Sequence, residues 1–268
     1  MIGLGQNVNI PDANFKAYLV GNTAINTNGD AEIQFSEATA FGGAITIASQ
    51  NISDLTGIEQ FTSLTELYCQ SNQLTLLDVS NNTALTELWC SSNQFTSLDV
   101  SNNTALTFLD CHNNQLTSLD VSTNTALTSL ICSYNQLTSI DVSQNTALSY
   151  LYCGNNQLVT LNVQNGNNTN WNLYFNFDFV CINNLFLTCI TVDDDVWSTS
   201  NLTVASGNID PQHYFSTNCP PLSAIQEHTT NKELLKVTDL LGRETKQTNQ
   251  PLFYIYDDGT VEKRIVIE

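Results

Sequence analysis

Five oxygen-bearing side chains near the N-terminus have a spacing that could hold a calcium ion. Counting from Asn26, they occupy positions 1, 3, 5, 7 and 12 of a loop: Asn26, Asn28, Asp30, Glu32 and Glu37. Calcium takes about six to eight oxygen ligands, and a carboxylate that offers both oxygens closes such a loop at its last position. Asn26 in place of aspartate and Ala31 in place of glycine favour an ordinary polar loop instead, so both alternatives stay open.

A second set of carboxylates recurs every 21 residues. Its members are Asp78, Asp99, Asp120 and Asp141, with Asn162 at the next step. Stacked carboxylates repel one another and therefore need hydrogen-bond donors or a cation. Neighbouring serine, threonine and backbone N–H groups are the simpler source of donors, and a ladder of cations is the alternative.

Five of the eight cysteines share this interval: Cys69, Cys90, Cys111, Cys132 and Cys153. In stacked parallel strands, about 4.8 Å apart, such side chains point the same way. Their Cβ atoms are then farther apart than the ~3.8 Å usual in a disulfide. We therefore expect buried free thiols that pack as small apolar groups. Cys181, Cys189 and Cys219 are expected to lie outside this column.

Sequence motifs of common enzyme classes are absent. The histidines at positions 112, 213 and 228 are scattered. There is no G-x-S-x-G nucleophile motif, no H-E-x-x-H zinc motif, no phosphate-binding loop and no C-x-x-C pair. We therefore expect that the protein is not an enzyme.

The interval of 21 residues also governs the apolar positions, and so defines the elements that position these side chains. Two leucine columns and one asparagine column begin at Leu64, Leu67 and Asn72 and continue for five copies. The resulting pattern, L-x-x-L-x-C-x-x-N-x-L, is typical of a leucine-rich repeat solenoid. One coil cannot bury its apolar edge alone, so successive coils stack around one continuous core.

Each coil contains a short segment with the alternation of a strand. In Leu67-Tyr68-Cys69, the side chains of Leu67 and Cys69 should point into the core and that of Tyr68 away from it. Strands of successive coils should form a parallel, concave sheet, and the asparagine column should satisfy backbone groups of the turns. The fold class is thus an α/β-type solenoid dominated by β structure.

The positions that vary between copies lie on the outward side of these strands, and they are rich in aromatic rings. The predicted ligand-binding residues are Glu66, Tyr68, Glu87, Trp89, Phe108, Asp110, His112, Tyr150 and Tyr152. Exposed rings on a rigid surface suit stacking on sugars or hot-spot contacts with proteins. The alternative is that aromatic side chains simply favour strands and support one another across them.

Both flanks depart from the repeat, as end caps should. We expect a helix within 10–20, begun by Asp12, and an irregular first coil at 45–61. The predicted parts are an N-terminal cap with the helix and an EF-hand-like loop (1–44), repeats (45–175), a C-terminal cap (176–221), a linker (222–231) and a small β-rich tail (232–268).

Charge is distributed unevenly along the chain. The formal net charge is −19, and six of the seven lysines and arginines lie between Lys232 and Arg264. So acidic a body argues against binding to nucleic acid or to an anionic membrane. No apolar run is long enough to span a membrane. The composition fits an extracellular setting that is rich in cations.

The coils of 45–163 resemble the leucine-rich repeat family, in the short bacterial form related to the internalins. This resemblance implies a right-handed, curved solenoid used for recognition. Similar C-terminal caps contain "LTCI", "VDD" and a final "NC", which here implies a disulfide between Cys189 and Cys219 and a free Cys181.

The tail resembles the C-terminal sorting domain of type IX secretion substrates. The segments that carry this resemblance are "KVTDLLGRE" (236–244) and "FYIYDDGTVEKRIVIE" (253–268). It implies export across the outer membrane of a Gram-negative bacterium, with recognition by the type IX secretion machinery and release or anchoring at the surface. No signal peptide is visible, so we expect that "QNVNIPDANF" lies near a trimmed N-terminus.

Together these features favour a non-enzymatic binding protein outside the cell, which recognises a protein or glycan through its concave face. It needs no cofactor other than possible calcium. Two alternatives stay open: a structural surface spacer without a specific ligand, and an accessory module of a polysaccharide-degrading system.

Overall fold

The chain divides into two compact units, Met1–Cys219 and Pro220–Glu268, which are described separately. The computed structural model describes residues 6–170 and 178–220 of the chain. In the C-terminal unit it describes the backbone of three strands, at 234–238, 251–256 and 261–265.

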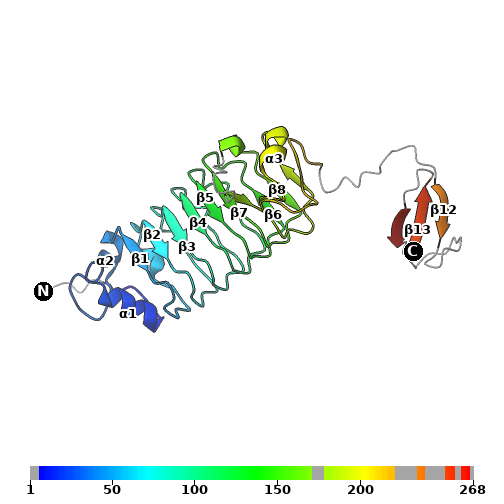
Figure 1. Ribbon diagram of the computed structural model, residues 1–268. Helices are drawn as coiled ribbons and strands as arrows, with labels where there is room; N and C mark the ends of the chain where they lie inside the picture. The colour runs from blue at the N-terminus through cyan, green and yellow to red at the C-terminus, as the bar shows by residue number, and fades with distance from the viewer. Residues whose placement is uncertain (1–5, 171–177, 221–233, 239–250, 257–260, 266–268) are drawn as a thin grey trace. The chain divides into compact units, whose positions relative to one another are not determined.

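The first unit is a solenoid whose coils each contribute one short strand to a long parallel sheet (Figure 1). The strands of this seven-stranded sheet are, in spatial order, β1 (Ala44–Thr46), β2 (Glu66–Tyr68), β3 (Glu87–Trp89), β4 (Phe108–Asp110), β5 (Ser129–Ile131), β7 (Tyr150–Tyr152) and β9 (Phe179–Val180). From β2 to β7 the register pairs residues 21 apart, for example Leu67 with Leu88. The predicted parallel-sheet solenoid is confirmed.

A second, shorter parallel sheet forms on another side of the coils. Its strands are, in spatial order, β11 (Tyr214–Ser216), β10 (Cys189–Thr191), β8 (Thr160–Asn162) and β6 (Ser139–Asp141). In the coil that contains β2, which has no strand in this second sheet, the apolar side chains of Leu77 and Val79 are buried. The core therefore lies between the two rows of strand segments.

Leucine columns fill that core. Leu67, Leu88 and Leu109 are fully buried, as are their equivalents in the next two coils, Leu130 and Leu151. Burial of one such side chain stabilises the fold by about 1.5–3 kcal/mol. Because every coil presents the same groove to its neighbour, the inward positions admit little variation.

The predicted asparagine column links adjacent coils through their turns. Asn93 accepts a hydrogen bond from Leu74 N at 3.0 Å and donates to Cys69 O and Cys90 O at 3.1 and 3.2 Å. The residue before each asparagine adopts a left-handed backbone, as Ser92 does with φ 54°. The side-chain amide thus supplies the hydrogen bonds that this turn cannot make within its own backbone.

A second asparagine ladder, which was not predicted from the sequence, runs along the other end of the coils. Its members are Asn82, Asn103, Asn124 and Asn145, all fully buried. Asn103 donates to Val79 O and Asn82 O of the preceding coil, at 3.0 and 2.9 Å. The recurring "NNTAL" and "TNTAL" segments were the sequence pattern that could have revealed it.

The N-terminal cap contains the predicted helix. Helix α1 (Ala13–Gly21) follows Asp12, whose Oδ1 accepts hydrogen bonds from Asn14 N and Phe15 N. Its buried stripe is narrow, since it consists of Phe15 and Leu19. The other carboxylate oxygen of Asp12 accepts from Ser53 N at 2.9 Å, which ties the helix start to the first coil.

The rest of this cap is short. Helix α2 (Phe35–Ala40) contains Glu37, the last position of the candidate calcium loop, and the 3-10 helix η1 (Ile58–Gln60) lies in the irregular first coil. Phe41, next to α2, packs edge-on against Phe61, with ring centroids 6.4 Å apart. These contacts close the first coil of the core.

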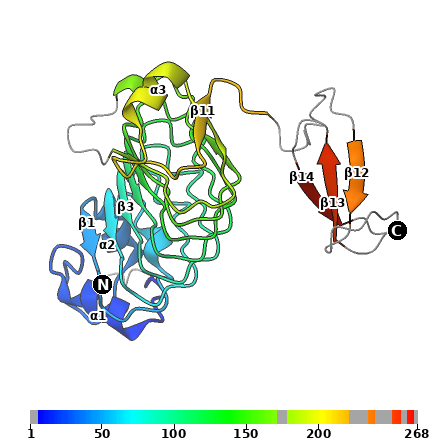
Figure 2. The ribbon, with the colours of Figure 1, turned by 45° about the vertical axis from the view of Figure 1, so that its right-hand side comes forward.

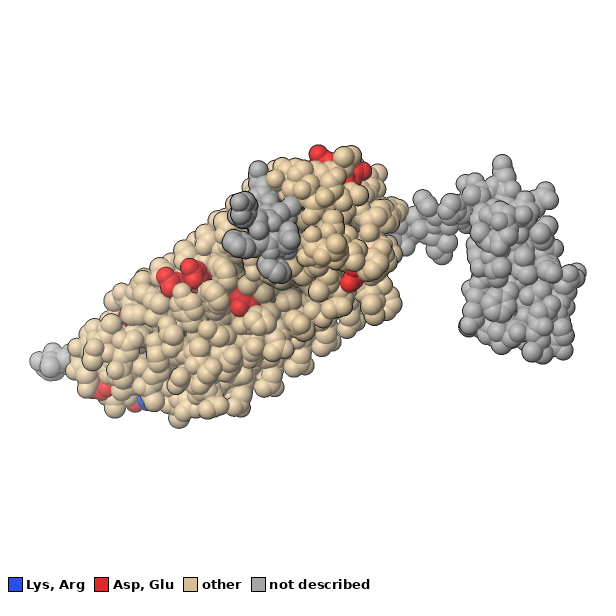
Figure 3. Space-filling model, in the orientation of Figure 1, with Lys and Arg blue, Asp and Glu red and all other residues tan. Residues whose placement is uncertain are grey.

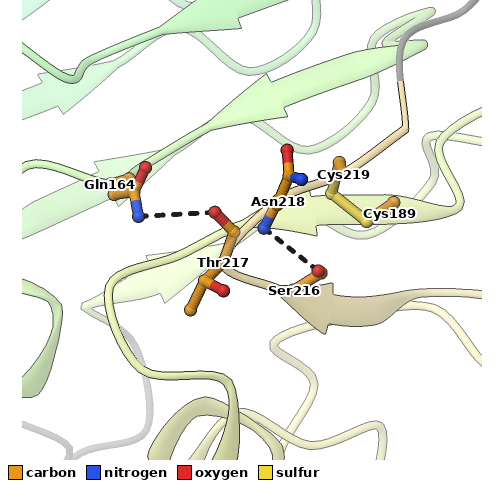
Figure 4. Close-up of a disulfide and its surroundings, with 6 residues drawn as sticks. All are labelled: Gln164, Cys189, Ser216, Thr217, Asn218 and Cys219. Carbon is orange, nitrogen blue, oxygen red and sulfur yellow. Dashed lines mark hydrogen bonds between the residues drawn. A yellow bond between two sulfur atoms is a disulfide. The ribbon is translucent and has the colours of Figure 1, made fainter.

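The C-terminal cap is closed by a helix and a disulfide. It contains the 3-10 helix η2 (Asn168–Asn170) and helix α3 (Asp195–Asn201), whose first turn is capped by Asp194 through Trp197 N. Cys189 on β10 forms a disulfide with Cys219, with their Cα atoms 5.8 Å apart (Figure 4). The pairing implied by the resemblance is thus present, and it joins the last coil to the chain that follows β11.

The described strands of the second unit form an antiparallel sheet. Strand β13 (Pro251–Tyr256) lies between β12 (Leu234–Thr238) and β14 (Val261–Ile265) (Figure 2). A small β tail was predicted, and these strands agree with it. In the sequence, Gly242 and the dipeptide Asp258-Gly259 favour turns in this tail, and these positions lie outside the described residues.

Candidate binding surface on the seven-stranded sheet

Three aromatic rings from successive strands stack across the outward face of the seven-stranded sheet. Trp89 and Phe108 have ring centroids 4.3 Å apart and planes within 18° of parallel. Tyr68 is tilted against Trp89 at 5.8 Å. Tyr68 lies opposite Trp89 in register, whereas Phe108 lies opposite Glu87. The stack of Trp89 on Phe108 is therefore a diagonal contact between β3 and β4, which long aromatic side chains can span.

Two glutamates hold the edges of these rings. Oε2 of Glu87 accepts from Trp89 Nε1 at 3.0 Å and from the Tyr68 hydroxyl at 3.1 Å. The same hydroxyl lies 2.8 Å from Oε2 of Glu66. A hydroxyl has one proton, so it donates to one of these carboxylates at a time. Burial and the two carboxylates together raise the pKa of Tyr68, which therefore stays neutral.

We call these five residues the acidic–aromatic cluster: Glu66, Tyr68, Glu87, Trp89 and Phe108. The cluster places two like charges, those of Glu66 and Glu87, side by side. Glu66 and Glu87 are paired in register on adjacent strands, a spacing of about 4.8 Å. Like charges placed opposite one another across strands are destabilising. The Tyr68 hydroxyl and the Trp89 N–H are neutral donors to this pair, and neither of them brings a positive charge to it.

Asp110 and His112 form a polar pair beside the cluster. His112 Nδ1 lies 2.7 Å from Oδ1 of Asp110, which also accepts from His112 N. The hydrogen bond to Asp110 raises the pKa of His112, although partial burial opposes it. Asp110 is only 4% exposed, so it acts on this surface through His112 rather than by direct contact.

Tyr150 and Tyr152 form a separate pair on β7, with ring centroids 4.9 Å apart. Burial, followed by the Tyr152 hydroxyl, raises the pKa of Tyr150. Strand β5 lies between this pair and the acidic–aromatic cluster, and it contributes Ser129 and Ile131. The predicted ligand strip thus consists of two aromatic groups separated by one strand.

The structure places all nine predicted ligand residues on or directly after strands of one sheet, and their role as ligands stays a prediction. The surface is narrower than the sequence suggested. The residues that occupy the position of His112 in other coils are Ser91, Ser133 and Gly154. All three are buried. A Cβ at Gly154 would lie 2.9 Å from Ile182 O, so this position requires glycine.

The candidate calcium loop is closed by its own hydrogen bonds. Glu37 accepts from Thr27 N and Asn28 N through Oε1 and from Gln34 N through Oε2. Asn28 donates to Oδ2 of Asp30 at 2.9 Å. Burial raises the pKa of Glu37, but these donors outweigh it and the net pKa is lowered.

The other loop oxygens are engaged as well. Glu32 forms an ion pair with Lys16 at 2.7 Å, and Oδ1 of Asn26 accepts from Gly29 N. Within the part of the chain that is described, no three His, Cys, Asp or Glu side chains form a group that could hold a metal ion. In this conformation the loop oxygens are engaged by hydrogen bonds and by Lys16, and calcium binding stays a prediction.

Each aspartate of the acidic column accepts a hydrogen bond from the backbone two residues ahead. The distances are 3.0 Å for Asp78 to Ser80 N and 2.9 Å for Asp99 to Ser101 N and for Asp120 to Ser122 N. Serine and backbone donors lower the pKa of these carboxyls. The simpler explanation, neighbouring donors, accounts for this column.

The cysteine column consists of buried free thiols, as predicted, but it is longer than expected. Cys181 was expected outside the column, and this was wrong. It follows Cys153 by 28 residues rather than 21, yet Cys153 N donates to Val180 O, which aligns the two cysteines. The extra residues lie in the connection before β9, and all six thiols are buried. Burial raises the pKa of each thiol, and raises that of Cys69 to about 12.

The last thiol contacts a histidine in the C-terminal cap. Cys181 Sγ lies 3.6 Å from His213 Nδ1, and Nε2 of the same ring lies 3.6 Å from Asp210 Oδ2. Burial raises the pKa of Cys181 and lowers that of His213, so both side chains are neutral. A nucleophilic thiolate needs the opposite shifts, together with access to solvent. This arrangement therefore caps the core and lacks the charge state of a catalytic cysteine.

Stacked parallel strands at 21-residue intervals, leucine-lined coils and an asparagine ladder at the turns define a leucine-rich repeat solenoid. A family model described as leucine-rich repeats (2 copies) matches residues 83–124. No curated protein matches the sequence. No helix among the described residues is long and apolar enough to cross a membrane.

Solved structures of three bacterial proteins are similar to this chain. The functional domain of InlJ from Listeria monocytogenes, which includes a cysteine ladder, is 38% identical over 72% of this chain, with a TM-score of 0.54. Internalin C2 and InlF from the same organism are 19% and 21% identical, over 84% and 80% of this chain, with TM-scores of 0.54 and 0.51. The match covers 39% of the InlJ chain, 59% of InlF and 96% of internalin C2. The two more distant likenesses support the fold alone.

Proposed function

We propose that this leucine-rich repeat protein is a non-enzymatic binding protein that recognises a protein or glycan through the seven-stranded sheet. One observation carries the proposal. The copies hold their inward residues almost constant, whereas the outward positions differ and bring Trp89, Phe108 and Tyr152 to the surface. Aromatic side chains on a rigid face are typical of binding hot spots.

The proposal extends to location. The resemblance of 236–244 and 253–268 to type IX sorting domains supports export to the surface or exterior of a Gram-negative bacterium. The cap disulfide between Cys189 and Cys219 fits an oxidising compartment outside the cytoplasm. Export places the seven-stranded sheet where a host or environmental ligand is accessible.

The test is a combined array of glycans and extracellular proteins, probed with the full chain and with Trp89→Ala. We expect at least one ligand class to bind the wild-type protein and to lose signal with the variant. Asp99→Ala, a change on the other edge of the coils, serves as the matched control and should leave binding intact. If neither the glycans nor the proteins of the array bind the wild-type protein, the protein is better described as a structural spacer.

A further inference from the structure

The acidic–aromatic cluster allows the chemistry of the ligand to be narrowed, and this step rests on the proposed function. Glu66 and Glu87 are adjacent and in register, and both are hydrogen-bonded only through Oε2 among the described residues. Their Oε1 atoms therefore keep acceptor capacity that no described residue uses. Two carboxylates with spare acceptors form a natural site for a group that carries several donors.

Among the described residues of the solenoid, no lysine or arginine neutralises this pair. Within residues 6–170 and 178–220 the sequence contains one lysine and no arginine. That lysine, Lys16, is bound to Glu32 at 2.7 Å. Figure 3 shows Asp and Glu residues on the surface where Figure 1 places strands β2 to β4, and no lysine or arginine beside them. A positive group from outside would therefore relieve a repulsion between Glu66 and Glu87 that no lysine or arginine of the described solenoid offsets.

The rings select among positive groups. Trp89 and Phe108 stack, and Tyr68 is tilted against Trp89, so the three rings form a row. The two carboxylates fix the Tyr68 hydroxyl and the Trp89 N–H at the edge of this row. A guanidinium is planar, stacks on aromatic faces and donates to carboxylates as a fork. An ammonium can also lie over a ring, but it is more strongly hydrated and lacks the fork geometry. A neutral sugar stacks equally well and leaves the charge repulsion in place.

We propose that the acidic–aromatic cluster binds an arginine side chain presented by a partner protein. The guanidinium lies against the ring row and donates to the free Oε1 atoms of Glu66 and Glu87. The strongly negative body steers positively charged partners toward this surface, so association is faster at low ionic strength.

Nuclear magnetic resonance of the full-length protein tests this directly through the indole N–H of Trp89, assigned with Trp89→Phe. The probes are acetylated hexapeptides with two arginines, and the same peptides with lysine or with citrulline, the neutral isostere of arginine. We expect the arginine peptide to shift the Trp89 resonance and to bind at least about tenfold more tightly than the citrulline peptide, with weaker binding as salt increases.

The variants separate this site from general electrostatics. Glu66→Gln combined with Glu87→Gln should weaken the arginine peptide at least about tenfold. Asp99→Asn combined with Asp120→Asn changes the net charge equally on the other edge and should retain binding. If the double variant has a lower melting temperature than the wild type, the affinity of the arginine peptide is measured with Glu66→Gln alone. Equal binding of arginine and citrulline peptides, or equal loss in both double variants, would overturn the proposal.

Two further outcomes also contradict it. One is a calcium chloride titration that produces the same Trp89 shift and displaces the peptide, since the cluster then holds an ion. The other is an array ligand that is a neutral glycan, sensitive to Trp89→Ala, while the arginine peptide does not bind. In that case the arginine assignment fails and the proposed function stands. If Trp89→Ala leaves every ligand bound normally, the proposed function fails as well.

Discussion

Asparagine side chains connect the coils at two places, and the chemistry of each place differs. In the column of Asn93 both the amide nitrogen and the oxygen are used. In the ladder of Asn103 the nitrogen donates twice, whereas the oxygen has no hydrogen-bond partner in the described structure. The second ladder therefore contributes through its donors, which satisfy carbonyl groups of the preceding coil.

This difference predicts the effect of an alanine substitution. Asn103→Ala removes two donors from buried carbonyls, so it should lower the free energy of unfolding by about 1–3 kcal/mol. The matched control is its exposed neighbour, Asn102, where alanine should change stability by about 0.5 kcal/mol or less. Urea unfolding of both variants measures this. Equal stability of the two would show that the second ladder contributes nothing.

The two described histidines respond to pH in opposite directions. Burial lowers the folded-state pKa of His213, so the unfolded chain binds its proton first and stability falls as pH drops below about 6.5. Asp110 raises the pKa of His112, whose contribution is present below about pH 6.5 and is lost as pH rises through the folded-state pKa.

Unfolding at pH 7.5 and pH 5.5 therefore distinguishes the two residues. His213 faces Cys181 and Asp210, and His213→Gln should reduce the loss of stability on acidification. His112→Gln should enlarge that loss, because it removes the opposing contribution. The carboxyl groups with lowered pKa values titrate below about pH 4.5 and do not interfere. Identical pH profiles for the wild type and His213→Gln would contradict this assignment.

At the scale of elements, periodicity decided what the sequence could predict. The columns that begin at Leu67, Cys69 and Asn72 repeat without error, so strands, core and thiols followed from spacing alone. Cys181 did not follow, because an insertion before β9 breaks the interval while the strand pairing continues. The contact between Cys181 and His213 joins residues 32 apart in the cap, and no local pattern encodes it.

In the candidate site too, some features could be predicted from the sequence and others could not. Alternation along each strand was enough to place the nine ligand residues on one sheet. Spacing could not predict that Asp110 is buried, or that Glu87 bridges Tyr68 and Trp89. In the candidate calcium loop, the ligand spacing was visible. The backbone donors that occupy Glu37 come from Thr27 and Asn28 in the loop and from Gln34 at the start of α2, so they depend on how the loop folds against that helix.

The calcium hypothesis makes an element-level prediction. If calcium binds the folded cap, it raises the melting temperature by mass action, and a chelator lowers it. Asp30→Ala combined with Glu37→Ala should abolish that shift. Asp54→Ala, in the neighbouring coil, should preserve it. A wild-type protein whose melting temperature does not change with calcium or chelator would leave the loop as a plain hydrogen-bonded turn.

For the whole molecule, the change in charge coincides with the change in structure. The acidic solenoid ends at Cys219, and six of the seven basic residues lie in the second unit. This coincidence supports a tail with a separate task. Deletion of 232–268 in a host with type IX secretion should leave the solenoid folded but retained in the periplasm. Normal export of the deletion variant would show that the tail is not a sorting module.

The central claim is that the seven-stranded sheet is the binding face, and one measurement tests it most directly. It is the affinity of an array-identified ligand for Trp89→Ala and Tyr152→Ala, compared with Asp99→Ala and Asp120→Ala on the other edge. We predict that each aromatic variant loses about 1–3 kcal/mol of binding free energy with little change in melting temperature, while the aspartate variants bind normally. Normal binding by both aromatic variants, with loss in the aspartate variants, would contradict the account.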